Sequence, residues 1–74
     1  MIKVWRTSQE LYLIQPMLSG VSLPESRRTW EELPIDLKNA IATLAIADVG
    51  NRIPRYGVQV QPNCFEIEDS ALGL

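Results

Sequence analysis

The clearest local signal in the chain lies in residues 29–51, which read TWEELPIDLKNAIATLAIADVGN. Thr29 and Glu32 have the residue types and the spacing of a capping box, in which the two side chains satisfy backbone N–H groups where a helix begins. Gly50-Asn51 is typical of a helix end, because glycine readily adopts the left-handed conformation that stops a helix. The sequence therefore predicts a helix from Ile35 to Val49.

The predicted helix is apolar on two sides. At about 100° per residue, one broad face collects Leu37, Ala40, Ile41, Leu44 and Ala45. A second stripe, on nearly the opposite side, collects Ile35, Ala42, Ile46 and Val49. A helix that is apolar around most of its circumference is buried around most of it, and a chain of 74 residues has few other elements to cover it. We therefore expect a second chain to cover part of this helix, with Ile46 as a contact residue.

Asp48 is the one charged residue near the middle of the main apolar face. It falls in the last predicted turn, where the helix dipole disfavours a negative charge. A structural ion pair with Arg52 or Arg55 is the preferred interpretation, and a carboxylate held for a partner is the alternative.

The C-terminal part predicts a β-hairpin whose turn is centred on Pro62-Asn63. Symmetric pairing about that turn matches Val58 with Ile67, Val60 with Phe65, and Gln59 with Glu66. This register places the four apolar side chains on the core face. The solvent face would then carry Gln59, Gln61, Cys64, Glu66 and Glu68. Residues 70–74 are expected to form a frayed tail.

The N-terminal part begins with a predicted strand, and residues 8–18 allow two interpretations. In the first, the chain turns at Ser8-Gln9 and returns as a strand, so that Val4 faces Leu13 and Trp5 faces Tyr12. In the second, Thr7 and Glu10 form a capping box and start a short helix. The hairpin is preferred because residues 11–14 are apolar on every side. Residues 19–26 are expected to form a loop.

Together these elements predict one α+β domain over residues 1–74. The expected architecture is a small two-layer domain in which an antiparallel sheet packs on one central helix. The sheet would be built from an N-terminal hairpin, or a strand followed by a short helix, and from the C-terminal hairpin.

The composition argues against catalytic chemistry. The chain is 46% hydrophobic and 22% charged, has no histidine and has a single cysteine, Cys64. Neither an internal disulfide nor a Cys/His zinc site can be built from these residues. Cys64, predicted to face solvent beside carboxylates, is expected to be an inert thiol, and Glu66, Glu68 and Asp69 to be a solvated acidic edge. We predict no enzyme activity, no catalytic residue, no metal and no cofactor.

The sequence gives no sign of a signal peptide, and its longest helix-like apolar stretch is too short to cross a bilayer. We therefore expect a cytoplasmic protein without membrane contact.

Two functional hypotheses follow. The first is a small regulatory or inhibitory protein that acts by protein–protein binding, including binding to itself as a homodimer. A phage or mobile-element accessory protein is the candidate class for such a chain. The alternative is a nucleic-acid-binding accessory protein that uses arginines in the loops flanking the helix. Trp30 beside arginine has the composition of interface hot spots, although covering the core is its more common role. The candidate partner-binding residues are Trp30, Arg27, Arg28, Arg52, Arg55 and Ile46.

Overall fold

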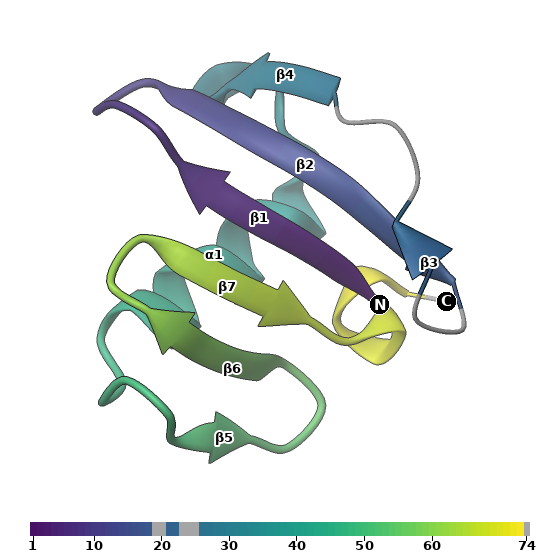
Figure 1. Ribbon diagram of the computed structural model, residues 1–74, viewed down its shortest axis with the longest axis vertical. Helices are drawn as coiled ribbons and strands as arrows, with labels where there is room; N and C mark the ends of the chain where they lie inside the picture. Colours follow the sequence, from purple (N-terminus) through teal and green to yellow (C-terminus); the bar gives the residue numbers. More distant parts are fainter. Residues whose placement is uncertain (19–20, 23–25, 74) are drawn as a thin grey trace.

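The computed structural model describes residues 1–18, 21–22 and 26–73. The strands are β1 (Ile2–Arg6), β2 (Leu11–Leu18), β3 (Val21–Ser22), β4 (Ser26–Thr29), β5 (Arg52–Ile53), β6 (Gly57–Gln61) and β7 (Cys64–Ile67), and the helices are α1 (Ile35–Ala45) and the short 3₁₀ helices η1 (Trp30–Glu32) and η2 (Asp69–Leu72). The sheet is antiparallel, with the order β3-β2-β1-β7-β6-β5 and with β4 also alongside β2. Helix α1 packs on one face of this sheet, behind it in Figure 1. The predicted two-layer α+β fold is confirmed.

The N-terminal hairpin is confirmed, but its predicted register is wrong by one residue. Val4 faces Ile14 and Trp5 faces Leu13. The cause lies in the turn, where the N–H groups of Thr7 and Ser8 both donate to the carbonyl of Leu11, at 2.9 and 3.4 Å. A slip of one residue moves every side chain of a strand to the other face. The slip therefore places Tyr12 on the core face and Leu13 beside Trp5 on the other face.

The C-terminal hairpin is also confirmed around Pro62-Asn63, again with a different register. Val58 pairs with Glu66 and Gln59 with Phe65, and a bulge lies between Gln59 and Gln61. The extra residue of a bulge cannot be located from apolar alternation alone.

The new register overturns two expectations about burial. Gln59 lies on the helix side of the sheet and is buried, and Cys64, on the opposite side, is buried as well. Both residues were expected to face solvent.

Helix α1 ends at Ala45, four residues before the predicted end at Val49. Strand β6 accounts for the difference. With its amide nitrogen toward the helix, Gln59 donates to the carbonyls of Leu44 at 3.0 Å and Ala47 at 3.2 Å. The N–H of Gly50 donates in turn to the carbonyl of Gln59 at 2.7 Å. These bonds satisfy carbonyls at the helix end and pull the chain toward the sheet.

The predicted capping box is present, but it opens η1 rather than α1. The carboxylate of Glu32 accepts hydrogen bonds from the backbone N–H of Thr29 at 2.9 Å and from its hydroxyl at 3.0 Å. Helix α1 begins after Pro34.

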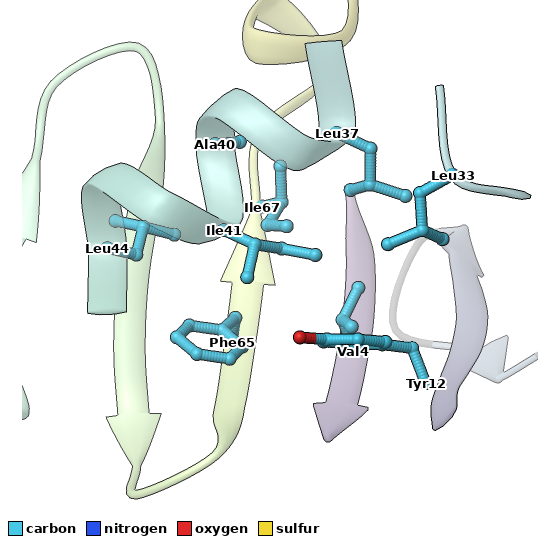
Figure 2. Packing of buried hydrophobic residues seen from close by; sticks show 9 residues of the cluster. All are labelled: Val4, Tyr12, Leu33, Leu37, Ala40, Ile41, Leu44, Phe65 and Ile67. Atoms are coloured by element: carbon cyan, nitrogen blue, oxygen red, sulfur yellow. The ribbon is translucent and has the colours of Figure 1, made fainter. Parts of the chain in front are cut away.

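The core lies between α1 and the sheet, as Figure 2 shows. It contains Val4, Tyr12, Leu33, Leu37, Ala40, Ile41, Leu44, Phe65 and Ile67. Four of the five residues predicted on the main helix face are buried, and Ala45 is exposed.

The segment expected to be a frayed tail is hydrogen-bonded and packed as far as Leu72. The hydroxyl of Ser70 donates to the carbonyl of Arg55 at 2.9 Å, and Ala71 and Leu72 pack against the core. Leu74 lies outside the described residues. Within the expected loop 19–26, residues 19–20 and 23–25 also lie outside them, whereas Val21–Ser22 form β3 and Ser26 begins β4.

Candidate functional site

Helix α1 does not cover the whole sheet. It leaves open the end that carries the β1–β2 and β6–β7 turns, and a groove of about 630 Å³ lies there. The groove is lined by side chains of α1, of the sheet, of η1 and of the two turns: Arg6, Gln9, Glu10, Tyr12, Thr29, Trp30, Glu31, Ile41, Ala42, Ala45, Gln59, Asn63 and Phe65.

Aromatic side chains from three elements contribute to the groove. The rings of Tyr12 and Trp30 contact each other with centroids 5.5 Å apart and planes tilted by 43°. Figure 2 shows Phe65 and Tyr12 side by side below Ile41, with the hydroxyl of Tyr12 directed toward Phe65. Within the described residues that hydroxyl has no hydrogen-bond partner, and it is accessible to solvent. Aromatic rings therefore make up part of the groove lining, and the hydroxyl of Tyr12 is available to an occupant.

The groove is lined by charged residues of both signs, Arg6, Glu10 and Glu31. Glu10 and Glu31 lie toward η1, where the carbonyl of Glu10 accepts the N–H of Trp30 at 3.0 Å. Arg6 lies toward the β6–β7 turn, since its N–H donates to the carbonyl of Asn63 at 2.8 Å. No ion pair links these three side chains in the part of the chain that the structure describes. The groove thus carries two carboxylates and one guanidinium that form no ion pair within the described residues.

An apolar ridge borders the groove. We use this name for Ala42, Ala45, Ile46 and Val49, of which the two alanines also line the groove. The side chain of Ile46 is 90% exposed and that of Val49 is 51% exposed. Ile35, at the other end of the predicted second stripe, is 67% exposed. Among the described residues, nothing covers this stripe, so the apolar surface anticipated from the sequence is open.

The predicted arginines are not brought together. Arg27 and Arg28 lie on β4, Arg52 lies on β5, and Arg55 lies in the following turn with a positive φ of 74°. Strands β4 and β5 are at opposite edges of the sheet. Arg27, Arg28 and Arg52 were expected in loops, and the structure places them in strands. Arg52 forms an ion pair with Glu68 at 3.9 Å.

Of the other two candidates, Trp30 lies in the groove and Ile46 lies on its border. Trp30 is half-buried against the core, with the Lys38 ammonium 5.9 Å from its ring centroid. Covering the core and lining the groove are thus compatible roles for this side chain.

The ion pair predicted for Asp48 is not present. Because α1 ends early, Asp48 is exposed beyond the helix rather than placed on its apolar face. Its carbonyl accepts the N–H of Asn51 at 3.0 Å, and in the described chain its carboxylate pairs with neither Arg52 nor Arg55.

The face of the sheet opposite α1 carries Trp5, Leu13 and the buried Cys64. Burial raises the pKa of the Cys64 thiol above its ordinary value of 9.0; Lys3 acts in the opposite direction and Glu66 in the same one. A thiol with a raised pKa stays protonated at neutral pH and is a poor nucleophile. The Lys3 ammonium lies 5.2 Å from the ring centroid of Trp5.

Within the described residues, no three Cys, Asp or Glu side chains lie close enough to hold a metal ion. No helix in the same residues has the length and apolar character needed to cross a membrane.

Comparisons with protein-family models, with curated proteins and with solved structures gave no significant match to this chain. The function therefore has to be argued from the groove, the ridge and their chemistry.

Several groove residues escaped the sequence analysis because two turns supply them. Arg6, Gln9, Glu10 and Asn63 come together only when β1 and β7 pair. The one sequence signal that could have identified the groove is the aromatic pair of Tyr12 and Trp30, and the predicted register turned Tyr12 to the wrong face.

Proposed function

We propose that this protein is a small non-enzymatic binding domain that acts on another polypeptide chain, in a regulatory or inhibitory role, through the groove and the apolar ridge. The observation that carries the proposal is the position of Ile46, 90% exposed beside a groove lined in part by aromatic rings. A large aliphatic side chain in water gains about 1.5–3 kcal/mol when it is fully buried. The ridge therefore favours association with an apolar surface.

The composition of the site matches that of interface centres. Binding energy at interfaces is concentrated in tryptophan, tyrosine and arginine residues that lie in pockets. Trp30, Tyr12 and Arg6 all line the groove. Its volume would also suit a small molecule. The exposed Ile46 beside the groove favours a polypeptide, because a small molecule inside the groove would leave this side chain in water.

The groove chemistry supports binding rather than catalysis. Thr29, the hydroxyl residue on its edge, directs its hydroxyl to Glu32 within the capping box, at 3.0 Å. Activation of a hydroxyl nucleophile requires a general base that is positioned for the purpose. Glu32 instead has a structural role at the start of η1.

The arrangement of the arginines does not favour the nucleic-acid hypothesis. Phosphate-backbone binding depends on several cations that follow one surface. Arg27 and Arg28 lie at one edge of the sheet and Arg52 lies at the other, while the groove itself contains one cation and two carboxylates.

The test uses immobilised wild-type protein and two variants in an extract of the native host. Ala42→Arg places a large charged side chain in the groove, where it occupies part of the volume. Ile35→Asp changes an exposed apolar residue outside the groove. We expect a partner that binds wild type and Ile35→Asp, is lost with Ala42→Arg, and binds the purified wild type directly in calorimetry. Equal retention by all three proteins would contradict the proposal. Capture of nucleic acid that is lost at moderate salt would favour the alternative instead.

A further inference from the structure

We infer that the occupant of the groove is a second copy of this chain, docked about a two-fold axis so that Ile46 of each copy enters the groove of the other. This inference rests on the proposed function, because it assumes that the groove and the ridge form a docking surface. It names the partner and the mode of assembly.

One surface of the molecule carries both a projection and a hollow. Ala42 and Ile46 are four residues apart and share one side of the helix end. Ala42 lines the groove, while Ile46 projects into solvent beside it. The side chains at positions 42 and 45 are alanines, which project little from the helix. The backbone of another chain can therefore approach the helix closely. A surface with these two features side by side can be complementary to itself.

The charges in the groove also favour a second copy. Glu10, Glu31 and Arg6 line the groove and have no ion-pair partner among the described residues. In a two-fold interface, when residue i contacts residue j of the other copy, j also contacts i. A two-fold arrangement of two grooves can therefore set Arg6 of each copy against the carboxylates of the other. A foreign partner would need this same charge pattern in reverse.

The position of the two features also predicts a closed dimer. A projection and a hollow on distant parts of a molecule generate open fibres when they associate. Here Ile46 lies beside the groove. One two-fold contact can therefore bury Ile46 of both copies and fill both grooves, and no free groove remains for a third copy.

Sedimentation velocity of the full chain tests the inference, over protein concentrations from about 10 µM to about 1 mM, where small interfaces associate. We expect wild type to shift from monomer to dimer across this range. Ile46→Asp should weaken the dimer by about tenfold or more, because it places a charge in the apolar contact. Ile35→Asp, with the same change at the far end of α1, is the matched control and should dimerise as wild type does.

A second variant approaches the contact from the groove side. Ala42→Arg leaves Ile46 in place and blocks the hollow, so it should also weaken the dimer. Both Ala42 and Ile46 are exposed, and thermal unfolding by circular dichroism checks that the variants fold. Dimerisation that survives both variants, or that Ile35→Asp weakens as much as Ile46→Asp does, would overturn the inference.

A strictly monomeric wild type at about 1 mM would also overturn it. The proposed function would survive that result if a host partner still bound in a manner that Ala42→Arg abolishes. The two failures are therefore distinguishable: a monomer with a groove-dependent partner refutes only the second copy, and a monomer without such a partner refutes both.

Discussion

The side-chain amide of Gln59 donates to the main-chain carbonyl of Leu44 at 3.0 Å, which joins strand β6 to the end of helix α1. The same amide reaches the carbonyl of Ala47 at 3.2 Å. One polar side chain on the core face thus contacts the chain where the helix ends.

Replacing Gln59 with leucine should destabilise the fold by about 1–3 kcal/mol, because the carbonyl of Ala47 loses the amide donor and that of Leu44 keeps only backbone donors, while the volume is conserved. Urea unfolding followed by circular dichroism measures the change. Gln61→Leu, on the exposed end of the same strand, is the control and should change the free energy of unfolding by less than about 0.5 kcal/mol. Equal effects of the two variants would refute the capping role.

Two glycines with positive φ should respond very differently to alanine. At Gly57, with φ of 131°, a Cβ atom would lie 1.9 Å from the carbonyl oxygen of Glu66. At Gly50, with φ of 85°, a Cβ atom would meet nothing within 4 Å. We expect Gly50→Ala to cost about 1–2 kcal/mol of backbone strain. Gly57→Ala should cost at least about 3 kcal/mol, because steric overlap adds to strain.

Chemical unfolding of both variants under the same conditions provides the comparison. A Gly57→Ala protein as stable as Gly50→Ala would show that β6 and β7 do not approach each other as described.

The capping box should make stability depend on pH. The backbone N–H of Thr29 and then its hydroxyl hold the pKa of Glu32 below its ordinary value of 4.5, and Arg28 adds to this shift. Because the folded pKa is the lower one, the carboxylate stabilises the fold above pH 4.5 and loses this effect as the pH falls through the lowered pKa. Glu32→Gln keeps a hydrogen-bond acceptor but cannot titrate. Wild type should therefore be the more stable protein at pH 7, and the two should converge in acid.

Unfolding free energies of the two proteins between pH 7 and about pH 3 test this expectation. Glu31→Gln removes a neighbouring charge outside the capping box and is the control. A difference between wild type and Glu32→Gln that stays constant over the whole range would contradict the assignment.

Local patterns predicted the architecture because each element has its own periodicity or cap. The apolar face of the helix, the Thr29–Glu32 box and the turn at Pro62-Asn63 are all local in sequence, and all are present. The registers of both hairpins were not predictable in this way. The register of the N-terminal hairpin depends on the carbonyl of Leu11, which accepts two N–H groups, and the register of the C-terminal hairpin depends on a bulge. In each hairpin a shift of one residue moves side chains to the other face of the sheet.

The candidate site was harder to predict because it depends on those registers. Tyr12 and Gln59 reach the groove only in the observed pairing, and Arg6 meets Asn63 only because β1 pairs with β7. The exposed stripe at Ile46 was recognisable, since an apolar residue opposite the core face is visible in a helical pattern. That a groove lies beside it follows from tertiary packing alone.

Tyr12→Phe should separate folding from binding. The ring is buried in the core, whereas within the described residues its hydroxyl bonds to nothing. Removal of the hydroxyl should therefore change the free energy of unfolding by less than about 0.5 kcal/mol. If the occupant of the groove uses this hydroxyl, the same change should weaken association by about 0.5–1.5 kcal/mol. Tyr56→Phe, a half-buried tyrosine outside the groove, is the control and should leave association unchanged.

Association is measured by sedimentation for the dimer and by calorimetry for a captured partner. A Tyr12→Phe protein that is much less stable would show that the hydroxyl serves the core, and one that associates as wild type does would show that the occupant does not contact it.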